Sequence, residues 1–181
     1  MRADRVARGL TLLLATVGVL GGVVACGGPE LQGNVFVGGE TRYRIGDLGA
    51  GWQRLSVADQ NDLAYHHGGM GAIVQANATC DPGADVPLTA LTNHLLIGFT
   101  ERDIREQRVV PMDEREALRT HVVARLDGVP RELVFYVIKK DDCVYDFALI
   151  TPPGESFLRA APDFERFVAG FTTDVPQAEG G

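Results

Sequence analysis

Residues 133–138 read Leu-Val-Phe-Tyr-Val-Ile and residues 144–150 read Val-Tyr-Asp-Phe-Ala-Leu-Ile, and these two stretches decide the fold. β-Branched and aromatic residues of this kind favour strands. Successive side chains of a strand point to opposite faces, and here both faces are apolar except at Asp146. A strand that is apolar on both faces is covered on both faces. We therefore predict a sheet with further structure packed on each side.

Turn signals join these stretches to their neighbours as an antiparallel meander. Asp127-Gly128 is a strong signal for a two-residue hairpin turn, Gly68-Gly69 suits another, and the Lys-Asp-Asp of residues 140–142 turns the last pair of strands. Alternating or apolar patterns predict the strands themselves. We expect them at residues 41–45, 51–55, 62–67, 72–80, 104–110, 115–126, 129–139 and 143–150.

Two stretches with apolar residues at helical spacing predict helices that cover the sheet. The first begins at residues 85–87, with Pro87 in its first turn, and ends at Gly98; the second begins at Pro162. Their apolar faces consist of Leu88, Leu91, Leu95 and Leu96 in the first, and Phe164, Phe167, Val168 and Phe171 in the second. This order of elements predicts an α+β fold, an antiparallel β-sheet with helices packed on it.

The N-terminus has the parts of an export signal. Residues 1–9 hold three arginines and one aspartate, and residues 10–25 form an uncharged run of 16 residues. A membrane-spanning helix needs about 20 apolar residues, so this run is short for a permanent anchor and suits a signal peptide. A plain secretory signal before a chance cysteine and an uncleaved membrane helix are the alternatives.

The run ends in Val23-Val24-Ala25-Cys26, which resembles the lipobox of bacterial lipoproteins. The resemblance implies that residues 1–25 are removed and that Cys26 carries a diacylglyceryl thioether, often with an added N-acyl chain such as palmitate. Two or more acyl chains anchor a protein stably to a membrane. Some bacteria read aspartate after the cysteine as an inner-membrane retention signal. Gly27 stands there instead, which favours the outer membrane and a periplasm-facing protein.

The remaining chain divides into a tether, one domain and a tail. Residues 26–39 are rich in glycine and predict a flexible lipidated tether, in which the apolar residues 34–37 can dock as a short strand. Residues 40–173 form the domain, and residues 174–181 a disordered tail. Removing residues 1–25 changes the formal net charge from −7 to −9. An acidic exported chain is a poor candidate for nucleic-acid binding, and no basic run predicts a second contact with anionic lipid.

Two cysteines remain beside the lipidated one, Cys80 and Cys143. An oxidising compartment and an even count predict a disulfide between them. Closing a loop of about 60 residues stabilises a fold by roughly 4 kcal/mol on the chain-entropy model. A catalytic or metal-binding thiol and a pair of unbonded thiols are the alternatives, although neither a C-x-x-C motif nor a nearby histidine supports them.

The domain resembles the PsbP-like or DcrB-like fold, an α/β/α sandwich. Three features carry the likeness: Gly51-Trp52 at an early strand, the hairpin from Asp127 to Asp141, and the closing segment Asp163–Phe171. Members of that family include a photosystem II subunit, a nuclear-import factor and small bacterial lipoproteins. The resemblance implies a protein that binds or helps to assemble other proteins, with no catalytic residue set.

A search for chemistry finds no catalytic, metal or cofactor motif. His66 and His67 are adjacent on a strand, so they point to opposite faces and cannot share a metal. The row Arg119, His121 and Arg125 can hold an anion, but we favour a solvated polar face as the interpretation. We interpret Asp113 and Glu114 as part of a surface turn, and Trp52 as a core residue.

The sequence therefore predicts a lipid-anchored binding, assembly or accessory module of the cell envelope without catalytic activity. We expect the membrane, through Cys26, and an envelope protein as partners, and no cofactor. One alternative is a carrier of a small molecule or lipid, which needs an enclosed apolar cavity between sheet and helices. The other is an envelope hydrolase, which needs polar side chains converging in one pocket.

Overall fold

The computed structural model describes residues 29–56, 61–80 and 86–176. Cys26 and the predicted signal peptide lie outside these residues. The strands are β1 (Glu30–Gln32), β2 (Val35–Gly38), β3 (Thr41–Arg44), β4 (Gln53–Arg54), β5 (Leu63–His67), β6 (Ala72–Cys80), β7 (Phe99–Met112), β8 (Arg115–Leu126), β9 (Val129–Lys140) and β10 (Cys143–Thr151). The helices are α1 (Leu88–Leu95) and α2 (Glu155–Ala169).

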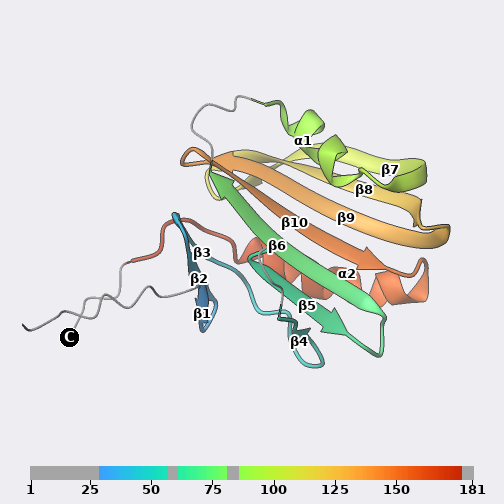
Figure 1. The fold of residues 1–181 in the computed structure, drawn as a ribbon, viewed down its shortest axis with the longest axis horizontal. Coiled ribbons are helices and arrows are strands. Elements are labelled where there is room, and N and C mark those ends of the chain that lie inside the picture. Colours follow the sequence, from blue (N-terminus) through green and yellow to red (C-terminus); the bar gives the residue numbers. More distant parts are fainter. Residues whose placement is uncertain (1–28, 57–60, 81–85, 177–181) are drawn as a thin grey trace, which may run out of the picture.

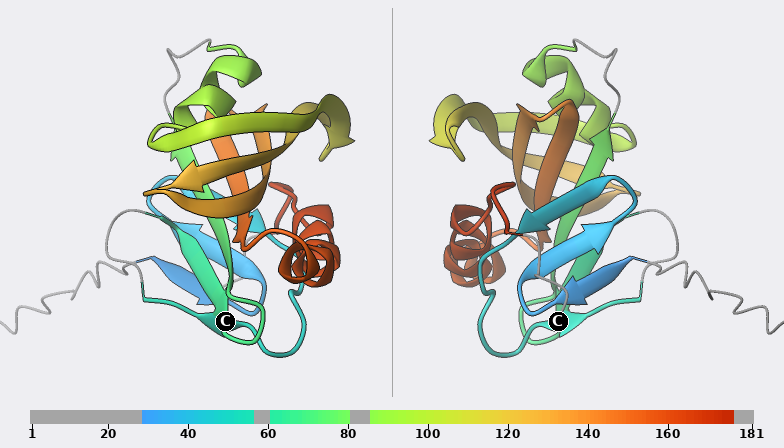
Figure 2. Two further views of the ribbon diagram at one scale, coloured as in Figure 1. Left: turned by 90° about the vertical axis from the view of Figure 1, so that its right-hand side faces the viewer. Right: turned by 90° about the vertical axis from the view of Figure 1, so that its left-hand side faces the viewer.

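Seven strands form one antiparallel sheet in the order β4-β5-β6-β10-β9-β8-β7 (Figure 1). The meander from β7 to β10 joins the β5–β6 hairpin where β10 pairs with β6. Strands β9 and β10, whose sequences are apolar on both faces, therefore lie in the interior of the sheet. The helices pack on different sides of this strongly twisted sheet (Figure 2). The predicted fold class, an antiparallel sheet with helices packed on it, is confirmed.

Two-residue turns set the register of the meander. Asp127 and Gly128 connect β8 to β9 with φ angles of 50° and 77°. Asp141 and Asp142 connect β9 to β10 with φ angles of 53° and 59°. Positive φ at both central residues is the geometry of a type I′ turn, whose twist matches that of the flanking strands. The predicted hairpins are confirmed, and their tightness leaves one possible register for each pair of strands.

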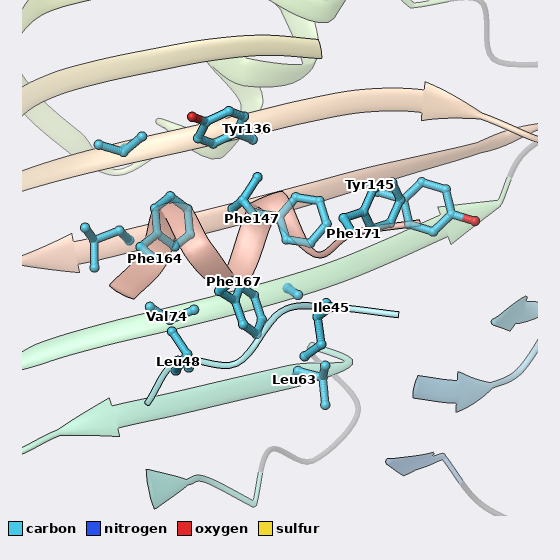
Figure 3. Packing of buried hydrophobic residues seen from close by; sticks show 14 of the residues in the cluster. Ile45, Leu48, Leu63, Val74, Tyr136, Tyr145, Phe147, Phe164, Phe167 and Phe171 are labelled. Atoms are coloured by element: carbon cyan, nitrogen blue, oxygen red, sulfur yellow. The ribbon is translucent and has the colours of Figure 1, made fainter. Parts of the chain in front are cut away.

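The core has two parts, one on each face of the sheet. Adjacent residues of β9 divide between them: Val134 is 0% exposed in the cluster beneath α2, and Phe135 is 3% exposed in the cluster beneath α1. The α2 side is rich in aromatic rings, with Phe147, Phe164 and Phe167 packed between helix and sheet (Figure 3). Burial on both faces, predicted from the sequence, is confirmed.

Strands β1 to β3 form a separate three-stranded sheet that corrects the predicted tether. Glycine-rich composition predicted flexibility over residues 26–39, but residues 30–38 contain β1 and β2. The reason is Phe36, which is 1% exposed and packs 5.1 Å from Tyr43, measured between ring centroids. The expectation that residues 34–37 dock as a short strand is confirmed. A backbone bridge between Arg44 and Thr172 joins this sheet to the end of the fold.

The start of the last helix was predicted wrongly. Helix α2 begins at Glu155, and Pro162 lies inside it. Proline lacks an N–H, so the carbonyl of Leu158, four residues earlier, receives no helix hydrogen bond from it. Leu158 is 71% exposed, and water can therefore satisfy that carbonyl. None of the helices in the described ranges is long and apolar enough to cross a membrane.

The edge strands also differ from their predicted limits. Strand β7 was expected at residues 104–110, but it runs from Phe99 to Met112 because it pairs with β8 over most of its length. Its first half is polar and exposed on both faces, so no alternating pattern marks it. Strand β4, expected at residues 51–55, has only two residues. Charges and two register shifts along β7 are features that protect an open sheet edge.

Candidate functional site

A groove of about 450 Å³ lies between α2 and the strands β7 and β9. Its floor consists of the apolar side chains of Val110, Met112, Val168 and Phe171, which are each less than 10% exposed. Arg108 and Glu165 stand at its rim, and Ala169 leaves part of the helix surface open. An apolar floor with a charged rim is the usual composition of a surface that receives another molecule.

Arg119, Tyr136 and Glu165 form a bonded cluster at one wall of this groove. Arg119 donates from Nε and Nη2 to Oε1 of Glu165 over 3.2 and 3.0 Å, and the Tyr136 hydroxyl donates to Oε2. Arg119 also pairs with Glu106 on β7. Burial, followed by the Glu165 carboxylate, raises the pKa of Tyr136 to about 12. The hydroxyl therefore stays protonated at neutral pH, and the cluster fixes α2 to the sheet.

Asp113 and Lys140 form an ion pair at the end of the groove. Their charged atoms lie 2.8 Å apart, and both side chains are almost buried, at 10% and 12% exposure. The backbone N–H of Thr173 donates to the same carboxylate over 2.9 Å. Burial by itself raises the pKa of Asp113, but the bonds from Lys140 and Thr173 outweigh it and leave that pKa lowered. The predicted surface turn is thus a structural joint between two hairpins and the C-terminal segment.

Each member of the basic row that could hold an anion already contacts a carboxylate of the chain. Arg119 pairs with Glu165, His121 lies 2.9 Å from Glu132, and Arg125 lies 2.8 Å from Glu101. The alternative, a solvated polar face, is wrong at the α2 end, since the Arg119 side chain is only 12% exposed. His121 also stacks on Phe157 at 4.8 Å.

The other histidines do not meet at a common site. His67 contacts the Trp52 ring at 5.5 Å between centroids, whereas His66 points to the opposite face and His94 lies exposed on α1. Among the residues that the structure describes, no three His, Cys, Asp or Glu side chains are grouped as metal ligands. Trp52 packs against the core, as predicted, and its indole N–H donates to Asp163 over 3.0 Å.

Asp146, the one polar exception in the stretches that decide the fold, lies opposite Asn77 of β6. Burial raises its pKa to about 6, although a hydrogen bond from Asn77 acts in the other direction. Burial likewise raises the pKa of Asp62, which accepts a hydrogen bond from the Tyr43 hydroxyl at 3.1 Å. The charge of Asp62 adds to the rise in the pKa of Asp146, but neither acid lines the groove beside α2.

The structure contains the predicted disulfide. Cys80 at the end of β6 and Cys143 at the start of β10 are direct cross-strand partners, and their sulfur atoms are bonded. The bond joins the β5–β6 hairpin to the meander. The other predicted site residue, Cys26, lies outside the described residues, so its lipidation stays a prediction.

The groove residues were not predicted from the sequence, although two of the three residues in the bonded cluster, Arg119 and Tyr136, had a signal. A two-residue turn at Asp127 and Gly128 places Arg119 directly opposite Tyr136. This pairing follows by counting back along both strands. Glu165 had no such signal, since only the packing of α2 on the sheet brings it to Arg119.

The seven-stranded antiparallel sheet with a helix on each side defines the class: the chain has a PsbP-like fold. Cyanobacterial PsbP from Synechocystis superposes with a TM-score of 0.50 at 14% identity, over 67% of this chain and 81% of that one. No protein-family model matches the chain, and no curated protein matches it.

Two further solved structures share the fold. LpqN, described as involved in cell envelope biogenesis of Mycobacterium tuberculosis, has a TM-score of 0.53 and 10% identity over 75% of this chain and 86% of that one. A Bacteroides thetaiotaomicron protein has a TM-score of 0.53 and 9% identity over 74% of this chain. The present chain spans only 45% of that protein's length. Identities this low establish the fold alone.

Proposed function

We propose that this chain is a lipid-anchored accessory module of the cell envelope, which binds a partner protein through the groove beside α2 and has no catalytic activity. The observation that carries the proposal is the groove itself, with its buried apolar floor and open charged rim. One of the proteins with the same fold, LpqN, is described as involved in envelope biogenesis. That description supports the same setting for this chain by analogy.

The lipid anchor rests on the lipobox-like sequence that ends at Cys26. A Cys26→Ser variant lacks the thiol that accepts the diacylglycerol, so we expect an unprocessed precursor that leaves the lipoprotein fraction. Globomycin, which blocks cleavage of the signal peptide, should make the chain with Cys26 accumulate as a precursor that still holds residues 1–25. Unchanged processing in both experiments would contradict the anchor. Fractionation of the two membranes tests the preference for the outer one.

The bonding inside the groove favours binding over catalysis. Polar side chains do converge there, as the hydrolase alternative requires. However, both oxygens of Glu165 already accept hydrogen bonds from Arg119 and Tyr136. The raised pKa of Tyr136, about 12, makes its hydroxyl a poor base at neutral pH. A carboxylate and a phenol held in this way act better as a rigid wall than as a proton shuttle.

The packing between helices and sheet favours surface binding over carriage of a lipid. The space beneath α2 is filled by Phe147, Phe164 and Phe167, which are each at most 1% exposed. On the other face, Leu96 and Phe135 pack beneath α1 with exposures of 1% and 3%. A ligand of acyl-chain size would have to displace these side chains.

Photo-crosslinking in intact cells tests the groove. A benzoyl-phenylalanine at Ala169, which is exposed inside the groove, should capture an envelope protein. The same probe at Leu158, exposed on α2 outside the groove, is the matched control. A product that forms equally at both positions, or at neither, would contradict a partner at this groove. Mass spectrometry of the product identifies the partner.

A further inference from the structure

The small sheet has an outer face of its own, opposite the side that packs on the core. Phe36 and Tyr43 point inward and are buried. Because side chains alternate along a strand and the cross-strand partners are known, the residues of the opposite face follow directly. They are Glu30, Gln32, Val35, Val37, Arg42 and Arg44.

Neither arginine of this face has a carboxylate partner, whereas five of the other described arginines do. Arg119, Arg125 and Arg166 each form an ion pair. Within the described residues Arg44 is exposed and unpaired. Arg42 is partly exposed, donates among these residues only to the carbonyl of Pro176, and has a buried Nε without a partner. Glu30 is the one acid on the face, where it accepts a hydrogen bond from Gln32.

This face is therefore net positive on an acidic chain. The sequence contains no basic run here, because Arg42 and Arg44 are only two and the buried Tyr43 stands between them. The antiparallel register places them beside Val37 and Val35, which are partly exposed. Basic and apolar side chains together on one flat surface are the composition that adsorbs to anionic lipid headgroups.

The position of the face relative to Cys26 identifies its partner. Glu30 is the fourth residue after Cys26, and the segment between them, even fully extended, spans at most about 14 Å. A bilayer that holds the acyl chains of Cys26 must then lie close to β1. The sheet stands at the other end of the molecule from α1 (Figures 1 and 2).

We infer that the outer face of the β1–β3 sheet rests on the anionic headgroups of the bilayer that holds the anchor, which orients the domain with α1 away from the membrane. The inference rests on the proposed lipid anchor at Cys26. Each arginine near an anionic surface strengthens such a contact about fivefold. Two arginines therefore favour this orientation about 25-fold over one without the contact.

Fluorescence quenching of the lipidated protein in vesicles tests the orientation. A fluorophore is attached through an added thiol at Gln32→Cys, on the face, or at Leu158→Cys, on α2. Vesicles contain a headgroup-labelled quencher in phosphatidylcholine alone or mixed with phosphatidylglycerol. We expect phosphatidylglycerol to increase quenching at position 32 and not at position 158, and added salt to reverse the increase.

Matched charge variants show whether the two arginines cause the effect. The double variant Arg42→Gln and Arg44→Gln should abolish the increase at position 32. The control, Arg115→Gln with Arg159→Gln, removes the same charge from exposed sites elsewhere and should retain it. If the first pair lowers the melting temperature, Arg44→Gln alone serves, because its side chain is exposed, and it should weaken the contact about fivefold.

The outcomes separate the orientation from the anchor. Protein that does not float with vesicles of either composition refutes the anchor at Cys26, and the orientation with it. Protein that floats, but whose quenching at position 32 is indifferent to phosphatidylglycerol or to the loss of Arg42 and Arg44, leaves the anchor standing and overturns the orientation.

Discussion

The two faces of the large sheet are built differently. The α2 face holds aromatic rings in mutual contact, with Phe147 5.1 Å from Phe171 and 6.3 Å from Phe167 between ring centroids. The α1 face has a small aliphatic cluster around Leu96 and Phe135, and Asp146 lies on the same face. One face therefore supplies most of the apolar stabilisation, while the other accommodates a partly buried acid.

Truncating the aromatic face should have the largest effect. Phe167→Ala removes a ring that is 1% exposed and contacts both Phe147 and Tyr65. We expect the free energy of unfolding to fall by about 4 kcal/mol, the usual range for a buried phenylalanine. Urea denaturation followed by circular dichroism measures it. A loss below about 1 kcal/mol would mean that α2 is not a main support of the fold.

Truncating the aliphatic face should cost less. Leu96→Ala removes a side chain that is 1% exposed in the smaller cluster. We expect a loss of about 3 kcal/mol, which lies within the range for buried leucines. The same denaturation experiment gives the value. If this variant proves less stable than Phe167→Ala, the ranking of the two faces is reversed.

Removing the charge of Asp113 should destabilise the protein at neutral pH. Asp113→Asn breaks the pair with Lys140 and leaves that ammonium almost buried, so we expect a loss of about 2 kcal/mol. The pKa of Asp113 is lowered in the folded state. Its stabilisation is therefore present above the unfolded pKa and lost as pH falls through the folded one. Thermal melting at pH 7 and pH 3 should show the variant's deficit shrinking in acid.

Removing the charge of Asp146 should raise the free energy of unfolding at neutral pH, and this change should be the smallest of the four. Its folded pKa is raised to about 6 from 3.8, so the folded state is relatively destabilised at pH 7 and regains stability as pH falls from 6 towards 4. Asp146→Asn keeps the shape without the charge and should stabilise by about 1 kcal/mol at pH 7, which is below the roughly 3 kcal/mol that the full pKa shift corresponds to, because Asp146 is only partly buried and solvent screens its charge. Melting from pH 7 down to pH 4 should show that advantage disappearing. A constant difference across this range would contradict the raised pKa.

The parts of the fold that followed from sequence are those with local signals. Asp127 and Gly128 predict a type I′ turn. The apolar stretches of β9 and β10 predict that these strands lie in the interior of the sheet. Pro162 led to the wrong prediction of where α2 begins, because proline is commoner in the first turn of a helix than in its interior. The glycines around β2 led to the wrong prediction of a flexible tether. Glycine-rich composition indicated flexibility, whereas burial of the single ring of Phe36 orders the segment.

The groove depended on information that no single stretch holds. Arg108, Tyr136 and Glu165 come from three elements, and only the docking of α2 on the sheet brings the last of them to the other two. Asp113 gave a misleading signal, since its neighbours Glu114 and Arg115 are typical of exposed turns. Its partner Lys140 lies at the end of a different hairpin.

The bridge between Arg44 and Thr172 has a mechanical consequence. It fastens β3, the strand of the small sheet that is farthest from the anchor in sequence, to the segment that follows α2, beside Phe171. A pull transmitted through the acyl chains would peel β1 from β2 one residue pair at a time. The small sheet would thus unfold first under force, while the seven-stranded sheet and its groove keep their structure.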